Sequence, residues 1–289
     1  MYTHQKLNFI AIMTFNRTPL LAELFNSIRS LIGLEQYRII IFQQVGSDEI
    51  SKLIELNKDL FFEHVRLSPT KDKVEEKIAE NRLRAYQYIF EEYDGESAIV
   101  FEDDVVLSTD TLLFFSMALT KFSNNQNFMG VNFGSVEPPH ANSENEYFLQ
   151  RFGIHGPASG LTRRTWLDIK PHLEAELGNH KHFDVAFEFF LRRGFMVTPS
   201  RSRYLDLGAN GTHAGSDDLP YFSGLRESWL RNPNSTILTE WSLAEPSKPF
   251  RDDCFVYRSR DNLFFKILWR LRLLGNSGIG SFLFKLMYK

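Results

Sequence analysis

Short apolar runs and longer amphipathic segments alternate through the first hundred residues. Each run is nearly continuous, is bounded by polar residues and has the length of a buried strand in a parallel sheet. The four predicted strands cover residues 7–13, 37–42, 61–67 and 98–101. Between them, apolar residues recur at helical spacing and predict helices over residues 20–34, 47–58 and 71–93. This alternation predicts an α/β fold with a doubly wound, mostly parallel sheet flanked by helices.

The pattern is less regular after residue 108. Apolar runs predict two more strands, and amphipathic spacing predicts helices over residues 109–122, 162–177 and 183–193. The two later strands are predicted at residues 128–133 and 195–199. Residues 138–147 are polar and irregular, which is typical of a flexible loop over a site. The glycine-rich residues 150–161 indicate backbone that passes close to a ligand.

Three consecutive carboxylates, Glu102, Asp103 and Asp104, follow the strand predicted at residues 98–101. They would lie at the carboxyl edge of the sheet, where open α/β sheets bind ligands. Neighbouring carboxylates repel one another, and partial burial raises the cost of keeping them ionised. A hard divalent cation such as Mg²⁺ or Mn²⁺ relieves that cost and could bind a diphosphate. The alternative is a solvated acidic turn.

The composition narrows the class of protein. The chain has 289 residues, 43% of them hydrophobic and 24% charged, and its formal net charge is -3. It therefore lacks an overall basic field for nucleic acid. The single cysteine, Cys254, excludes an internal disulfide and a cysteine-rich zinc site. We find no signal peptide and no transmembrane pattern, so we expect a cytoplasmic protein.

Residues 256–289 form a distinct C-terminal segment. Aromatic and aliphatic residues alternate there with basic ones, and Asp261 is the only acid after Arg258. A basic amphipathic helical extension of this kind can lie on an anionic membrane surface, here the inner face of the plasma membrane. The alternatives are a terminal helix that docks on its own domain and a dimer contact.

Three stretches together resemble the GT-A-fold nucleotide-sugar glycosyltransferases. The first is Phe-Ile-Ala-Ile-Met-Thr-Phe-Asn-Arg at residues 9–17, and the second is Ile-Val-Phe-Glu-Asp-Asp at residues 99–104. The Glu-Asp-Asp run resembles the metal-binding DxD element of N-acetylglucosaminyltransferase I-like enzymes. The third combines Phe-Asp-Val-Ala-Phe at residues 183–187 with Leu-Gly-Ala-Asn-Gly-Thr-His at residues 207–213, and it resembles bacterial enzymes that build surface polysaccharides.

The resemblance implies a domain over residues 1–255, with a nucleotide-binding half at residues 1–108 and an acceptor half at residues 109–255. It also implies roles for individual residues around a nucleotide-sugar donor. Asp104 would hold Mn²⁺ or Mg²⁺, with Asp103 and Glu102 assisting at the metal, the ribose or the donor sugar. The other residues implied at the nucleotide-sugar are Thr14, Asn16, Arg17, Gln44, Asn81, Arg82 and Gly160. For Gln44, Asn81 and Arg82, ordinary helix or turn polarity is the alternative.

Sugar transfer also needs a base that deprotonates the acceptor hydroxyl. The resemblance implies Asp184 for this catalytic role, with Glu188 as the second candidate, whereas a helix N-cap is the structural alternative for Asp184. His213 is a further candidate metal ligand or diphosphate contact, and the alternative is a structural histidine.

The function implied is a metal-dependent hexosyl- or N-acetylhexosaminyltransferase of surface polysaccharide synthesis. It would move a sugar from a nucleotide-sugar, with a UDP-sugar as the expected donor, to a glycan or lipid-linked glycan, with inversion. Two other functions stay open. One is a sugar nucleotidyltransferase, although that class has a glycine-rich basic loop after the first strand and residues 14–19 contain no glycine. The other is a non-catalytic module of the same fold that binds a carbohydrate or a partner.

Overall fold

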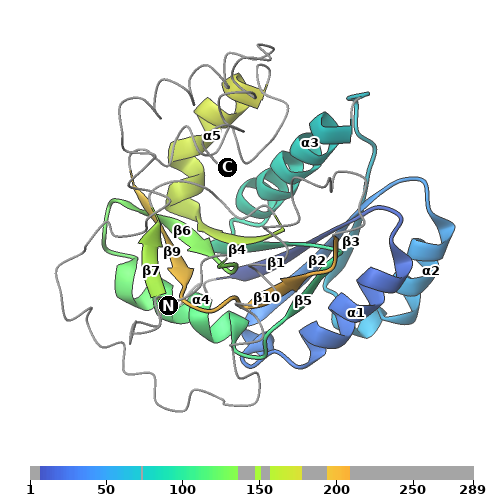
Figure 1. Ribbon diagram of the computed structural model, residues 1–289. Helices are drawn as coiled ribbons and strands as arrows, with labels where there is room; N and C mark the ends of the chain where they lie inside the picture. Colours follow the sequence, from blue (N-terminus) through green and yellow to red (C-terminus); the bar gives the residue numbers. More distant parts are fainter. Residues whose placement is uncertain (1–6, 73, 136–146, 151–156, 178–193, 209–289) are drawn as a thin grey trace, which may run out of the picture.

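The computed structural model describes residues 7–72, 74–135, 147–150, 157–177 and 194–208 (Figure 1). Several predictions of the sequence fall elsewhere in the chain. The candidate base at Asp184 or Glu188, the histidine His213 and the extension at residues 256–289 all lie outside the described residues.

Eight strands of the described chain form one sheet in the order β3-β2-β1-β4-β8-β6-β9-β7. Strands β3, β2, β1 and β4 are parallel to one another, as the sequence predicts. Beyond β4 the sheet is mixed, because β8 is antiparallel to both β4 and β6. The outer pair is β6 with β9, parallel, and β7 is antiparallel to β9. The bounds are β1 Asn8–Thr14, β2 Tyr37–Gln44, β3 Glu63–Leu67, β4 Ser97–Glu102, β6 Phe128–Asn132, β7 Tyr147–Gln150, β8 Ala158–Thr162 and β9 Phe195–Pro199.

Helices cover both faces of this sheet (Figure 1). One face packs against α1 (Thr18–Arg29), α2 (Asp48–Leu56) and α4 (Thr111–Phe122). The other packs against α3 (Val74–Gln87), which continues into a π-helical turn at Tyr88–Glu92, and α5 (Arg163–Leu177). Two short 3₁₀ turns, Leu34–Gln36 and Lys58–Leu60, precede β2 and β3.

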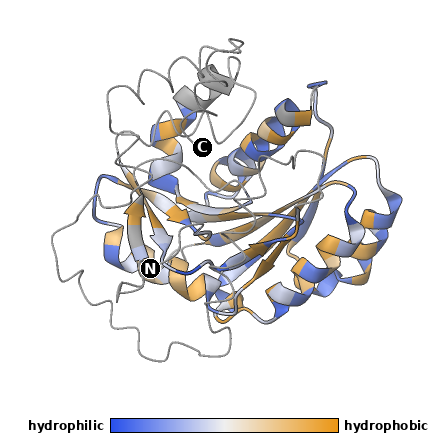
Figure 2. Ribbon diagram, viewed as in Figure 1, coloured by the Kyte–Doolittle hydropathy of each residue, from blue (hydrophilic) through white to orange (hydrophobic). Residues whose placement is uncertain are grey.

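Alternation along the strands divides the core into two layers. Ile10 and Ile12 of β1 belong to the layer under α1, whereas Phe9 and Ala11 belong to the layer under α3. This follows from the two-residue period of a strand, which sends successive side chains to opposite faces. Apolar residues accordingly concentrate along the strands and on the inner sides of the helices (Figure 2). The first four predicted strands are confirmed for this reason.

Four short strands depart from the predictions. Strand β8 occupies part of the glycine-rich stretch that was expected to pass close to a ligand. A side chain at Gly160 would collide with the ring of Phe115, so glycine here lets α4 pack tightly on the sheet. Strand β7 begins at Tyr147, the last residue of the predicted loop. The other two, β5 (Val105–Leu107) and β10 (Tyr204–Asp206), form a separate antiparallel pair.

Candidate functional site

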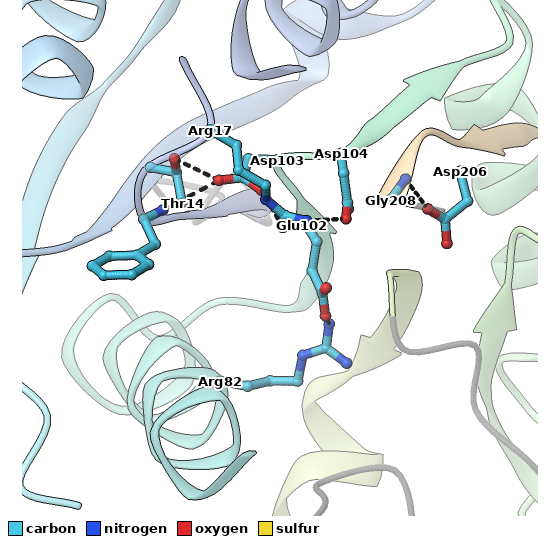
Figure 3. Close-up of polar contacts among 9 residues, drawn as sticks. Thr14, Arg17, Arg82, Glu102, Asp103, Asp104, Asp206 and Gly208 are labelled. Carbon is cyan, nitrogen blue, oxygen red and sulfur yellow. Dashed lines mark hydrogen bonds and ion pairs between the residues drawn. The ribbon is translucent and has the colours of Figure 1, made fainter. Parts of the chain in front are cut away.

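The carboxyl ends of β1 and β4 lie side by side and carry most of the site. The two strands pair in parallel from Asn8 opposite Ser97 to Met13 opposite Glu102. The turn after β1 therefore lies beside the three carboxylates that end and follow β4 (Figure 3). This is the carboxyl edge of the parallel half of the sheet, which is the usual ligand edge of open α/β sheets.

Asp103 is tied to the turn after β1. Its Oδ2 accepts hydrogen bonds from Oγ1 of Thr14 at 2.9 Å and from the backbone N–H of Phe15 at 3.2 Å. Arg17 forms an ion pair with its Oδ1. The side chain is only 1% exposed, and this burial raises the pKa of Asp103 above its ordinary value although Arg17 opposes the shift. Asp103 thus fixes the turn to β4 and has little contact with solvent.

Asp104 is bound on one side only. Arg17 donates a hydrogen bond to its Oδ2, so one guanidinium bridges both aspartates (Figure 3). The other oxygen, Oδ1, is buried and has no hydrogen-bond partner among the described residues. Burial lowers the pKa of Arg17, but the charges of Asp103 and Asp104 outweigh it and leave this pKa above its ordinary value. A buried acceptor without a partner is costly, so Asp104 retains an unused capacity to bind a donor or a cation.

Glu102 faces a second arginine. Arg82 of α3 is almost fully buried and donates to Oε1 of Glu102 at 2.7 Å (Figure 3). Burial raises the pKa of Glu102 to about 7, and Arg82 only partly opposes this shift. One residue before Arg82, Asn81 donates to Oε1 of Gln44 at 3.0 Å. The end of β2 and the middle of α3 therefore add a pair of carboxamides next to the acidic edge.

Asp206 is a further carboxylate at the site, and sequence reasoning missed it. Strand β10 pairs with β5, with Asp206 opposite Val105, and the N–H of Leu207 donates to the carbonyl of Asp104 at 2.7 Å. The side chain of Asp206 lies near that of Asp104 and accepts from the N–H of Gly208 at 2.7 Å (Figure 3). Burial raises its pKa to about 7, and the charge of Asp104 adds to the shift.

The sequence held one signal for Asp206, since this residue opens the glycine-rich stretch at residues 206–215. Its proximity to Asp104 depends on the β5–β10 pairing, which no local pattern reveals. Of the other predicted residues, Asn16 is exposed in the turn after β1, and Gly160 lies inside the sheet beneath Phe115. Asp184, Glu188 and His213 are outside the described residues, so their roles stay predictions.

The carboxylates were tested as ligands of a divalent cation. Among the described residues, no group of three or more His, Cys, Asp or Glu side chains could hold a metal ion by itself. Mg²⁺-like sites in phosphate-handling enzymes, however, use one or two carboxylates and complete their coordination with substrate phosphates and water. The unpartnered oxygen of Asp104 and the nearby carboxylate of Asp206 fit that incomplete set. The residues present therefore suit a cation that is shared with a bound diphosphate.

Comparison with known proteins identifies the fold. No protein-family model and no curated protein sequence matches the chain. The crystal structure of S. aureus TarS 1-349 is similar, at 10% sequence identity and a TM-score of 0.50 over 77% of this chain and 64% of that one. The same protein in complex with UDP is similar at 11% identity and a TM-score of 0.50, over 68% and 59%. The chain thus spans less than two thirds of either structure.

A looser likeness, at 14% identity and a TM-score of 0.43, is to the mannosyltransferase PcManGT from Pyrobaculum calidifontis in complex with GDP-Man and Mn2+, over 80% of this chain and 72% of that one. A TM-score this low supports no argument. The TarS structures, with the strand order and helical layers described above, show that the chain has a glycosyltransferase-type α/β fold of the GT-A kind. The more specific likeness to N-acetylglucosaminyltransferase I-like enzymes stays a prediction.

Proposed function

We propose that this protein is a glycosyltransferase that moves a sugar from a nucleotide-sugar to a hydroxyl group of a glycan or lipid-linked glycan. One observation carries the proposal. Two arginines and three buried or half-buried carboxylates converge at the carboxyl edge of β1 and β4, in a fold of the glycosyltransferase type. Carboxylates outnumber arginines at this site, so it suits a cation, and its arginines suit the diphosphate that the cation accompanies.

The donor would lie across the ends of β1, β2 and β4. Arg17 is about one third exposed, so its remaining N–H groups can reach a phosphate while it holds the aspartates. Thr14 and Asn16 lie in the same turn and would line the nucleotide. The carboxamides of Gln44 and Asn81 would contact the base or ribose, because they present both donors and acceptors. UDP is the nucleotide that we expect.

Metal chemistry would depend on Asp104. A bound Mn²⁺ or Mg²⁺ would neutralise charge that grows on the leaving diphosphate. Asp104 would hold the ion through its unpartnered oxygen. Glu102, paired with Arg82, would keep that arginine oriented toward the donor phosphates or ribose. Asp103 and His213 are the other two metal ligands that the sequence predicts.

The acceptor side of the proposal rests on the sequence. Asp184, or else Glu188, would take the proton of the acceptor hydroxyl as it attacks the sugar, with inversion at the anomeric carbon. The sugar transferred would be a hexosyl or N-acetylhexosaminyl group, and the pathway surface polysaccharide synthesis. Gly160 is not part of this proposed site, because Phe115 fills the space in front of it.

A screen of nucleotide-sugars by thermal shift, with and without Mn²⁺, tests the proposal. A ligand that binds only the native state raises the melting temperature, so the correct donor should stabilise the protein and do so more with Mn²⁺. Asp104→Asn should lose the Mn²⁺-dependent part of the shift. Asp168→Asn, which changes an exposed aspartate of α5, is the matched control and should keep it. A full panel of nucleotide-sugars without any shift would contradict the proposal.

Membrane attachment is a separate part of the proposal. Within the described residues, no helix is long and apolar enough to span a bilayer. We propose that residues 256–289 attach the enzyme to an anionic membrane surface, where a lipid-linked acceptor would be found. Removal of the residues after Arg260 should release the protein from vesicles that contain anionic lipid. Equal binding of the full and shortened chains would contradict this attachment.

A further inference from the structure

Among the described residues, Asp206 forms no ion pair of its own, although the charge of Arg17 acts on it. Its carboxylate accepts a hydrogen bond from the N–H of Gly208. Arg17 is already engaged by Asp103 and Asp104, and Arg82 by Glu102. The local charge therefore exceeds what the two arginines neutralise, and the excess lies between Asp104 and Asp206.

Gly208 lets the carboxylates of Asp104 and Asp206 approach the backbone closely. A side-chain carbon built on Gly208 would lie 2.9 Å from Oδ1 of Asp206 and would collide with Oδ2 of Asp104. These two oxygens, one from the turn after β4 and one from β10, thus approach the same point. Oδ2 of Asp104 is the oxygen that pairs with Arg17, and the unpartnered oxygen of the same carboxylate is Oδ1. One backbone hydrogen bond joins the two segments, and a second orients the carboxylate of Asp206. Leu207 N–H bonds to the Asp104 carbonyl, and Gly208 N–H bonds to the Asp206 carboxylate.

Asp103 differs from this pair in how its oxygens are used. One accepts from Thr14 and from the backbone of Phe15, and the other pairs with Arg17. A metal ion at Asp103 would have to displace these bonds, including two within the turn after β1. Oδ1 of Asp103 also lacks a hydrogen bond but forms an ion pair with Arg17. Oδ1 of Asp104, in contrast, has neither a hydrogen bond nor an ion pair among the described residues. The geometry therefore favours Asp104 over Asp103 as a ligand.

We infer that Asp206 is the second protein ligand of the divalent cation, together with Asp104, whose Oδ1 has no partner among the described residues, and that Asp103 is a positioning residue for the turn after β1. The inference rests on the proposed function, because a bound diphosphate completes the coordination. It assigns the metal to one carboxylate from the turn between β4 and β5 and one from the end of β10, rather than to the acidic run alone. The run supplies one ligand, and β10, which pairs with β5, supplies the other.

Mn²⁺ binding to the full chain measures this directly. Titration calorimetry, or the loss of the free Mn²⁺ signal in electron paramagnetic resonance, gives a Kd with UDP present and without it. We expect Asp206→Asn and Asp104→Asn each to weaken Mn²⁺ binding at least about tenfold, as is usual when a metal site loses a supporting group. Asp168→Asn should leave the Kd unchanged.

Gly208→Ala tests whether Mn²⁺ binding depends on the close approach of Asp104 and Asp206, and it removes no charge. The backbone of Gly208 does not need the left-handed conformation that favours glycine, so the strain of an alanine there falls on the Asp104 and Asp206 carboxylates, which its methyl group would displace. We expect Gly208→Ala to weaken Mn²⁺ binding about tenfold as well. Asp103→Asn should change the Kd less than threefold but lower the melting temperature, because it disturbs the turn at Thr14. Gly208→Ala disturbs the proposed ligands Asp104 and Asp206, whereas Asp103→Asn disturbs the proposed positioning residue. Their effects on the Kd for Mn²⁺ should therefore differ.

The outcomes distinguish this inference from the proposed function. If Asp104→Asn loses Mn²⁺ affinity and Asp206→Asn does not, the inference is overturned. Nucleotide-sugar turnover by the unmodified chain would still support the proposed function in that case. A larger loss in Asp103→Asn than in Asp206→Asn would also overturn the inference. Weakened Mn²⁺ binding in both Asp206→Asn and Gly208→Ala supports the inference, even if no nucleotide-sugar is turned over and the function fails.

Discussion

The pair of strands β5 and β10 carries a cluster of charges at each end, and the two clusters differ in balance. At one end, Arg203 and Asp110 form a buried ion pair at 3.0 Å, with side chains 1% and 7% exposed. Ser108 donates to the same carboxylate at 2.6 Å, and Thr111 donates to the carbonyl of Arg203 at 3.0 Å. One carboxylate thus meets one guanidinium at this end, so the two charges balance.

At the other end, Asp104 and Asp206 face each other with Arg17 shared between Asp104 and Asp103. Charge is in excess and one buried oxygen lacks a bond. Both clusters contain a buried aspartate, Asp110 at one end and Asp104 at the other, so burial alone does not mark a functional site. The comparison teaches that a charge-balanced pair fixes the β5–β10 strands in place, whereas an excess of carboxylates leaves capacity for a ligand.

The largest expected effect on stability is at the balanced end. Asp110→Ala leaves the buried guanidinium of Arg203 without its carboxylate, and it should lower the free energy of unfolding by about 3–5 kcal/mol. Asp104→Asn should cost much less, because it removes one of several repelling carboxylates. Urea denaturation of the two variants beside the unmodified chain measures the difference. Equal losses of unfolding free energy in the two variants would show that both clusters contribute equally to stability, which would contradict the comparison.

A change of pH should act on the unbalanced end. The pKa values of Glu102 and Asp206 are both raised to about 7 in the folded chain, above the ordinary values of 4.5 and 3.8. A carboxyl with a raised folded-state pKa contributes stability that is complete below its unfolded pKa and is lost as the pH rises through the folded one. The metal-free protein should therefore become less stable between about pH 4 and pH 7.

Mn²⁺ should offset this loss at pH 7.5 and have little effect at pH 5, since protons and metal compete for the same oxygens. Thermal melts across this range, with and without Mn²⁺, provide the measurement. Asp206→Asn should flatten part of the pH dependence, and Asp168→Asn should not. A melting temperature that is independent of both pH and Mn²⁺ would argue against an unbalanced cluster.

The smallest effect is expected at the carboxamide pair beside the acidic edge. Gln44→Ala removes one partner of a 3.0 Å hydrogen bond and one candidate contact to the nucleotide. We expect KM for the nucleotide-sugar to rise about two- to tenfold with little change in kcat, because the lost bond is remote from the reacting atoms. Steady-state kinetics test this. A fall in kcat with constant KM would place Gln44 nearer the reaction than we propose.

The first half of the fold follows from the sequence, because β1, β2 and β4 are continuous apolar runs with polar ends. The position of Glu102, Asp103 and Asp104 at the carboxyl edge was predictable for the same reason. The short strands were not predictable, since β5, β8 and β10 depend on pairing between residues far apart in the chain. Asp206 was missed on that account. The sequence favoured a ligand contact for Gly160, because no local pattern indicates that this residue packs against Phe115.

The central claim is that the acidic edge of β4 serves nucleotide-sugar chemistry, and release of nucleoside diphosphate tests it most directly. The unmodified chain is incubated with a panel of nucleotide-sugars and Mn²⁺, and chromatography measures the diphosphate that is formed. We predict release from at least one donor, retained in Asp168→Asn and reduced at least about a hundredfold in Asp104→Asn, because charge on the leaving group would no longer be stabilised. Release that is unaffected by Asp104→Asn, or no release from any donor, would contradict the account.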